Sequence, residues 1–416
     1  MKIVKAAFAK GNSAFFFDDQ RAIKNGAAHD GFVYVGEPVT PGFSRIRQAG
    51  QSISVLLMLE DGQIACGDCA AVQYSGAGGR DPLFLAEEYV PFLEKHIRPL
   101  LEGLEIGTFR EMAKHFSELI IEGRPLHSAI KYGLTQALLD ARARALKLIP
   151  CEVVCQEYNL PVIAERVPIF GQTGDNRYDN VDKMILKGIE VLPHGLINNV
   201  EEKLGRNGEK LRDYVRWLVK RVEQLRTSET YRPDLHIDVY GTIGQIFDNN
   251  MEKVADYVAS LEKDAGGLNL YIEGPVDMEE KQRQIEGLKK ITDRLRSIGS
   301  PVKIVADEWC NTFEDVRDFT DAKSCHMVQI KTPDLGGIHN IVESVIYCRQ
   351  HGMEAYQGGT CNETDNTAKM CVHLAVAARA ERMLAKPGMG FDEGFTIVNN
   401  ELERIIAILR LRNGVK

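Results

Sequence analysis

Residues 268–307 read LNLYIEGPVDMEEKQRQIEGLKKITDRLRSIGSPVKIVAD and contain a complete strand–helix–strand unit. Short apolar runs at its two ends, LNLYIE at 268–273 and VKIVAD at 302–307, predict two buried strands. The segment between them, 278–299, predicts a long amphipathic helix. Parallel strands need a crossover of this length, usually a helix, so the unit predicts a parallel sheet.

The same alternation continues on both sides of this unit. The pattern predicts further strands at 167–170, 189–193, 235–240, 326–330, 353–357 and 382–386, and another long helix at 209–227. Eight strands that alternate with helices are typical of a (β/α)₈ TIM-type barrel, here over residues 161–416. The weakest link is 171–188, which offers only a short connection between the first two strands.

Residues 1–160 predict a different kind of unit, an α+β capping domain. A strand at 51–59 is followed by the turn signal DGQ, and three helices are predicted near 84–102, 108–122 and 126–147. Lys5 and Lys10 interrupt any signal-peptide core at the start of the chain, which favours an edge strand there.

Composition excludes several function classes. The net charge of −8 disfavours a general nucleic-acid or membrane-surface partner. No apolar run reaches the ~18 residues of a membrane span. The chain has nine cysteines, an odd number, and they are scattered, which indicates a reducing compartment; we expect the cytoplasm.

Three acidic residues end three successive barrel strands, about one strand–helix unit apart: Asp238, Glu273 and Asp307. Each alone would be interpreted as a helix cap or loop anchor. At equivalent ends of neighbouring strands they would instead meet at one rim, where their mutual repulsion calls for a positive partner. Oxygen ligands of this kind suit Mg²⁺ or Mn²⁺.

The other strand ends carry residues that could bind or move protons. Lys331 and Gln329 lie two apart on the sixth strand and so share a face. Burial and a nearby metal would lower the pKa of Lys331 toward that of a general base, although a structural ion pair with one of the carboxylates is the alternative. The remaining strand-end candidates are Gln172 on the first strand, His194 on the second, and Thr360 and Cys361 after the seventh.

These motifs resemble the enolase superfamily and, within it, the methylaspartate ammonia-lyase family. The resemblance rests on FGQTGDN (170–176), VLPHGLINN (191–199), QIKTPDLGG (329–337), GGTCNETD (358–365) and, in the first domain, QYSGAGGRD (73–81). It runs over nearly the whole chain in length and order.

The resemblance implies a carbon–nitrogen lyase that converts L-threo-3-methylaspartate to mesaconate and ammonia in amino-acid degradation. Mg²⁺, with Mn²⁺ as a substitute, would bind the three carboxylates, and a monovalent cation such as K⁺ would be an activator. Lys331 would take the C3 proton, and His194 would serve the other diastereomer from the opposite face. Substrate contacts would come from Gln172, His194, Gln329, Thr360, Cys361, Gln73 and Leu384. The resemblance also implies a homodimer and a first domain that caps the barrel mouth.

Three alternatives remain open. A Schiff-base aldolase could use a lysine on the sixth strand, although three carboxylates beside it argue against this role. Another enolase-superfamily enzyme, such as a dehydratase or cycloisomerase, would often carry a Lys-x-Lys pair on the second strand, which here ends in Pro193-His194. A non-catalytic binding barrel would show no turnover.

Two further motifs carry little weight. CGDC at 66–69 matches a redox dithiol pattern but follows a strand-like stretch and does not open a helix. YGTIG at 240–244 has too few glycines for a dinucleotide site.

Overall fold

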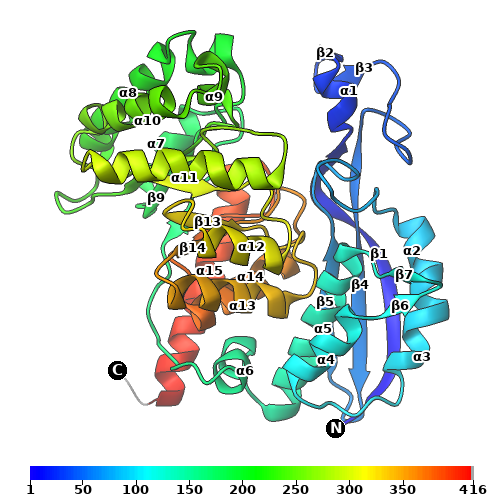
Figure 1. Cartoon of the computed structure of the whole chain (residues 1–416). Helices are drawn as coiled ribbons and strands as arrows, with labels where there is room; N and C mark the ends of the chain where they lie inside the picture. The colour runs from blue at the N-terminus through cyan, green and yellow to red at the C-terminus, as the bar shows by residue number, and fades with distance from the viewer. Residues whose placement is uncertain (414–416) are drawn as a thin grey trace.

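The computed structural model describes residues 1–413 and contains a closed parallel barrel beside an N-terminal α+β region (Figure 1). Eight strands close the barrel in the order β10-β11-β12-β13-β14-β15-β8-β9, and every neighbouring pair is parallel. Their bounds are β8 Ile169–Phe170, β9 Val191–His194, β10 Asp234–Asp238, β11 Leu270–Glu273, β12 Lys303–Ala306, β13 Met327–Ile330, β14 Glu354–Gln357 and β15 Arg382–Leu384. The predicted barrel and all eight predicted strands are confirmed.

Helices surround the barrel strands on their outer side. They are α7 Asp179–Leu186, α8 Glu209–Leu225, α9 Thr242–Ile246, α10 Met251–Ser260, α11 Lys281–Ser297, α12 Phe313–Asp321, α13 Ile338–Gln350, α14 Asp365–Ala378 and α15 Phe391–Asn413, with the π-helix η2 Val200–Leu204 and the 3₁₀ helix η3 Leu261–Lys263. In α11, Ile285, Leu288, Ile291 and Leu295 are buried at helical spacing, which explains why this charged segment packs as a helix. The short connection at 171–188 contains α7, so the first unit has its helix after all.

A smaller cluster of side chains fills the barrel interior. Its members are Phe170, Val191, Tyr271, Val305, Met327, Tyr356 and Leu384, all buried. Inward-pointing side chains of this size pack a barrel core and leave no pore through it. Side chains that could meet a substrate therefore lie at the rim, where the strands end.

The N-terminal region is built on a three-stranded antiparallel sheet, β1 Ile3–Asp18, β4 Arg47–Leu59 and β5 Ile64–Ala70, with β1 at its edge as predicted. Helix α5 (Ser128–Leu146) packs closely on β5. A Cβ on Gly67 would lie 2.2 Å from the carbonyl oxygen of Gly133, so both positions need glycine. The other elements are α1 Gln20–Lys24, β2 Ala28–Asp30, β3 Val33–Val35, α2 Ala86–Phe92, η1 Leu93–Ile97, α3 Arg98–Leu101, α4 Phe109–Ser117, β6 Ile120–Ile121, β7 Arg124–Pro125 and α6 Pro150–Glu157.

Two predicted helices of this region differ from the structure. The segment predicted as one helix at 84–102 is divided into α2, the π-helix η1 and α3. Pro99 lacks the N–H that a continuous α-helix needs there, which accounts for the interruption. The helix predicted at 108–122 ends at Ser117, because Glu122 and Gly123 both have positive φ and turn the β6–β7 hairpin.

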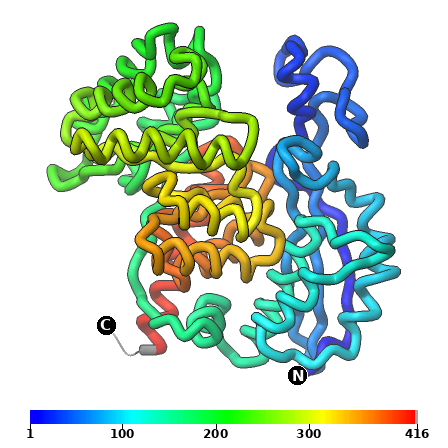
Figure 2. The backbone as a smooth tube through the Cα atoms, viewed as in Figure 1, coloured from blue at the N-terminus to red at the C-terminus, as the bar shows by residue number. Residues whose placement is uncertain are grey.

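A bulge in β1 connects the N-terminal region to the barrel through hydrogen bonds. The register of β1 with β4 shifts between Asn12 and Phe16, and the displaced residues contact the loop that follows β14. Ser13 Oγ donates to Asn362 Oδ1 at 2.7 Å, and Ala14 N–H donates to the Glu363 carbonyl at 3.1 Å. Figure 2 shows the chain leaving this region through its lower end before it enters the barrel. No helix within residues 1–413 is long and apolar enough to cross a lipid bilayer.

Candidate active site

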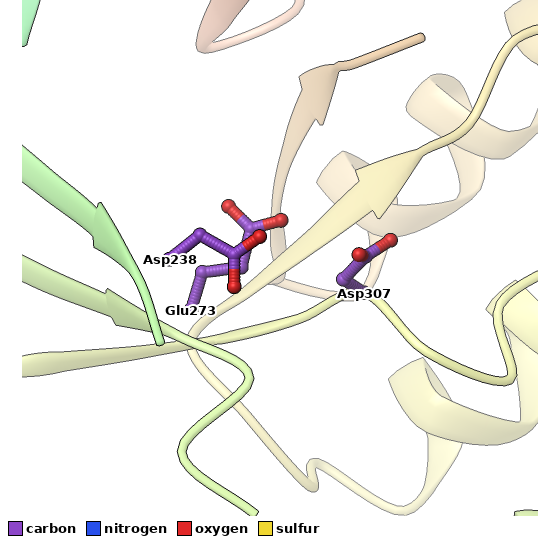
Figure 3. Close-up of side chains that lie close together, drawn as sticks. All are labelled: Asp238, Glu273 and Asp307. Atoms are coloured by element: carbon purple, nitrogen blue, oxygen red, sulfur yellow. The ribbon is translucent and has the colours of Figure 1, made fainter. Parts of the chain in front are cut away.

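Three carboxylates converge at the carboxyl ends of β10, β11 and β12 (Figure 3). Asp238 and Glu273 are paired in register as the last residues of their strands, and Asp307 directly follows β12. One ligand oxygen from each lies within 4.8 Å of the others, and all three residues are buried. The predicted cluster therefore exists, and an all-oxygen set of this kind suits a hard divalent cation.

The electrostatics of this cluster call for a cation. Burial, followed by the charge of Asp307, raises the pKa of Asp238 well above its usual range. Burial and the charges of Asp238 and Asp307 do the same to the pKa of Glu273. Three buried carboxylates cannot all ionise cheaply side by side, and a divalent cation between them removes that cost. The side chains present therefore fit a metal.

Glu273 is held from beneath by three side chains of the barrel interior. The Tyr356 hydroxyl lies 2.8 and 2.9 Å from its two carboxylate oxygens, and Gln329 Nε2 donates to Oε1 at 2.7 Å. His236 Nε2 lies 2.7 Å from Oε2, and both residues are fully buried. Such partners fix the orientation of a metal ligand. Neither Tyr356 nor His236 was predicted from the sequence, although His236 alternates with Asp238 on one strand and so had to share its face.

Lys331 follows β13 and lies against Asp307, with 2.6 Å between its Nζ and Asp307 Oδ1. Burial lowers the pKa of Lys331, but the charges of Asp307 and Glu308 outweigh burial and raise the pKa above its usual value. The prediction that the pKa of Lys331 is lowered is therefore wrong when only the side chains of the protein act on it. The ion pair that we considered as the alternative is present, and it places the amine beside the metal cluster.

His194 ends β9, four strands away from β13 in the closed barrel, so it lies across the mouth from Lys331. Its backbone φ of 64° is in the left-handed region, and its Nε2 lies 3.6 Å from Asp238 Oδ2. Burial, followed by the charge of Lys331, lowers the pKa of His194 to about 4. The ring is therefore neutral at ordinary pH and has a nitrogen free to accept a proton.

A cavity of about 420 Å³ lies between these two residues. All the predicted site residues except Glu273 line it, and Glu273 lies fully buried beneath. The lining residues that had been predicted are Gln73, Gln172, His194, Asp238, Asp307, Gln329, Lys331, Thr360, Cys361 and Leu384. Residues from both the N-terminal region and the barrel meet at this cavity, so the first region does cap the barrel mouth.

On the capping side of the cavity, polar contacts link Arg47, Asp18, Gln73 and Cys361, and neither Asp18 nor Arg47 was predicted from the sequence. Asp18 accepts from Gln73 Nε2 at 2.7 Å and forms an ion pair with Arg47. Because its amide nitrogen is engaged in this way, Gln73 presents its oxygen toward the barrel, where it accepts from the Cys361 thiol at 3.3 Å. Gln172 is anchored at the opposite side by donating to the Gly388 carbonyl.

The Gly-rich segment 73–81 also closes against the barrel. Arg80 Nε donates to Asp334 Oδ2 at 2.9 Å, and its guanidinium lies 3.5 Å from Glu308. These contacts join residues far apart in the sequence, so no local sequence pattern predicts them.

The two cysteines of CGDC do not form a dithiol site. Cys66 and Cys69 lie on β5 as free thiols, and residues three apart on a strand point to opposite faces. Burial and Asp140 raise the pKa of Cys66, and burial raises that of Cys69. Neither is activated as a nucleophile.

Comparison with known proteins gives matches over nearly the whole chain. Family models described as Methylaspartate ammonia-lyase N-terminus and C-terminus match residues 1–159 and 161–411. Methylaspartate ammonia-lyase from Citrobacter amalonaticus is 65% identical over 413 residues, 99% of this chain and 100% of the relative.

Solved structures agree with the sequence matches. The crystal structure of the Citrobacter amalonaticus enzyme containing (2S,3S)-3-methylaspartic acid has a TM-score of 0.98 at 65% identity and covers 99% of this chain and 100% of its own. The Mg complex of β-methylaspartase from Clostridium tetanomorphum has a TM-score of 0.96 at 55% identity, with the same coverage. An L-Ala-D/L-Glu epimerase from Bacillus subtilis, at 16% identity and a TM-score of 0.65, covers 95% of this chain and 91% of its own and shares the fold.

Proposed function

The chain belongs to the methylaspartate ammonia-lyase family and is a carbon–nitrogen lyase acting on methylaspartate, and we propose that its substrate is the L-threo, (2S,3S) isomer. The products are mesaconate and ammonia, and the reaction is reversible. The structural relative that contains (2S,3S)-3-methylaspartic acid supports this choice of isomer. The observation that carries the proposal is a buried carboxylate cluster with a lysine and a histidine facing each other across one cavity.

Asp238, Glu273 and Asp307 would hold Mg²⁺. Their oxygen-only donor set, their burial and their raised pKa values support a divalent cation, and a related enzyme is known as its Mg complex. When bound, the metal supplies positive charge at the place where negative charge develops on a substrate carboxylate.

Lys331 would act as the general base for the threo substrate. With a divalent cation held by the cluster, the carboxylate charges that raise the pKa of Lys331 would be offset, and its amine would be neutral. That amine takes the proton from C3, and the electrons of the C3–H bond move toward the adjoining carboxylate. They then form the C2–C3 double bond as the C2–N bond breaks and ammonia leaves. The position of Lys331 at the rim, 2.6 Å from Asp307, supports this role, since the base must lie close to the carboxylate that binds at the cluster.

His194 would be the base for the erythro diastereomer, whose C3 proton points the other way. Its neutral ring and its place across the barrel from Lys331 support this role. It would also hydrogen-bond the substrate carboxylate. Its Nε2 lies 3.6 Å from Asp238, which belongs to the cluster where that carboxylate would bind.

The other cavity residues would hold the two carboxylates and the amine. Gln172, Gln329, Thr360 and Cys361 provide polar groups at the strand ends, and Gln73 provides an amide oxygen from the cap. Leu384 provides an apolar wall beside the methyl and amino groups.

Several finer points complete the proposal. The domains would be a capping domain at 1–160 and a catalytic barrel at 161–416, close to the bounds of the two family matches. Mn²⁺ would replace Mg²⁺, because oxygen ligands suit both metals, whereas activation by a monovalent cation such as K⁺ rests on the resemblance.

Nine free cysteines support a reducing compartment such as the cytoplasm. A homodimer is the proposed assembly.

The direct test is to incubate the protein with 3-methylaspartate and Mg²⁺ and to follow the conjugated product by ultraviolet absorbance. We expect product with the threo isomer and none after chelation of divalent metal. The Asp307→Asn variant provides the control for a non-enzymatic signal. An active chelated enzyme or an inactive wild type with Mg²⁺ would refute the assignment.

A further inference from the structure

A buried ion pair lies behind the cavity, at the ends of β13, β14 and β15. Lys386 is 1% exposed, and its Nζ donates to three oxygens: Thr332 Oγ1 at 2.8 Å, the Gly358 carbonyl at 2.7 Å and Glu363 Oε1 at 3.0 Å. All three donors of the ammonium are therefore satisfied.

Glu363 is equally well satisfied and fully buried. Its Oε1 accepts from the Thr332 hydroxyl at 2.6 Å, and its Oε2 accepts from the Tyr132 hydroxyl at 2.9 Å. Tyr132 lies on α5, so this contact reaches the capping region. Desolvating two charges is expensive, and a hydrophobic pair is often at least as stable. Stability alone is therefore a weak reason for this arrangement.

The pair is joined to the proposed active site through its neighbours in the chain. Thr332 directly follows Lys331, so the hydroxyl that bridges Lys386 and Glu363 belongs to the residue beside the base. The pair also lies against Gly359, just before Thr360 and Cys361. A Cβ on Gly359, whose φ is +152°, would lie 2.5 Å from Lys386 Nζ and 2.9 Å from Glu363 Oε1.

We propose that the Lys386–Glu363 ion pair is a positioning device that fixes the backbone of Lys331 through the Thr332 hydroxyl. The pair does not touch the carboxylate cluster. Its partners are the ends of β13, β14 and β15, whereas the metal ligands lie on β10, β11 and just after β12. Its loss therefore displaces the base, while the three metal ligands keep their own backbone positions and the charge of Lys331 remains near Asp307. This inference rests on the proposed function, since it assumes that Lys331 takes the C3 proton.

The first test compares Thr332→Val with Thr332→Ser. Valine keeps the shape of the side chain and removes the bridging hydroxyl, whereas serine keeps the hydroxyl. We expect kcat for the threo substrate to fall about 10- to 100-fold in Thr332→Val, the size of loss that a displacement of about 1 Å produces, and to change little in Thr332→Ser. Turnover of the erythro substrate, assigned to His194, should fall much less.

The second test removes both charges together, Lys386→Met with Glu363→Gln, so that neither charge is left buried alone. The matched control is Lys183→Met, which breaks an exposed ion pair with Asp392. We expect the double variant to lose kcat for the threo substrate while its Mg²⁺ affinity, measured by calorimetry without substrate, stays within about threefold of the wild type. The control should keep both properties.

Each outcome decides between positioning and a purely structural role. A lowered melting temperature with unchanged kcat, or an equal loss on the threo and erythro substrates, would overturn the inference. The same holds if Thr332→Ser loses as much as Thr332→Val. If the double variant does not fold, the two Thr332 variants still decide. A wild type without turnover of threo-3-methylaspartate would instead refute the proposed function.

Discussion

Replacing Lys331 is the sharpest test of the proposed chemistry, because the residue has two separable roles. It is the proposed base for the threo substrate, and it is the cation beside Asp307, 2.6 Å away. Lys331→Ala removes both roles. Lys331→Arg keeps a positive charge near Asp307, but a guanidinium stays protonated and cannot accept the C3 proton. We therefore expect both variants to lose threo turnover.

The size of the loss follows from the surroundings of Lys331. Removal of a general base costs ~10²–10⁴-fold in rate, or about 3–6 kcal/mol at ~1.4 kcal/mol per factor of ten. We expect the upper half of this range, because the neighbouring acids are already engaged. Asp307 belongs to the carboxylate cluster, and Glu308 faces Arg80. His194 lies across the barrel and cannot reach a proton on this face.

The assay must hold metal occupancy constant. The charge of Lys331 lowers the pKa of Asp307 against the effect of burial, so Lys331→Ala raises that pKa further and weakens Mg²⁺ binding. Rates are therefore measured at saturating Mg²⁺, with calorimetry to verify binding, alongside deuterium exchange at C3. His194→Ala should reduce erythro turnover more than threo turnover. Threo turnover by Lys331→Arg above a tenth of the wild-type rate would refute the base assignment, as would equal losses of both diastereomers in the two alanine variants.

Three further outcomes are expected. Exhaustive chelation should abolish activity and Mg²⁺ should restore it, while Asp307→Asn should weaken both Mg²⁺ binding and turnover; calorimetry and the absorbance assay measure the two effects. Tyr356→Phe should lower Mg²⁺ affinity about 10- to 100-fold, because the lost hydroxyl orients the carboxylate of Glu273; an unchanged dissociation constant would contradict this role. Cys66→Ser combined with Cys69→Ser should leave turnover largely intact, and a loss in a folded variant would show that these thiols matter.

The secondary structure of the barrel could be predicted because local sequence patterns specify its strands and helices. Buried parallel strands are short apolar runs, and the helices between them repeat apolar residues at helical spacing, as Ile285, Leu288 and Leu295 do. The predicted helix bounds were wrong where backbone geometry, and not the spacing of apolar residues, determined where a helix ends. Pro99 interrupts the helix at 84–102, and positive φ angles at Glu122 and Gly123 end the next one early.

The sequence by itself determined the eight strand–helix units and, through them, which residues stand at the rim. A strand end is a local property, and the parallel order brings all such ends to one edge, so Asp238, Glu273 and Asp307 could be assigned together.

Only the tertiary structure decided what surrounds those residues. The pKa of Lys331 depends on how close the charges of Asp307 and Glu308 lie to it. These charges raise the pKa, whereas burial lowers it, and their larger effect reverses the predicted shift. The Lys386–Glu363 pair joins the ends of three strands to Tyr132 on the cap, and these contacts span up to 231 residues of sequence. No periodicity encodes such contacts, because they depend on how the barrel closes and, for Tyr132, on how the capping region docks onto it.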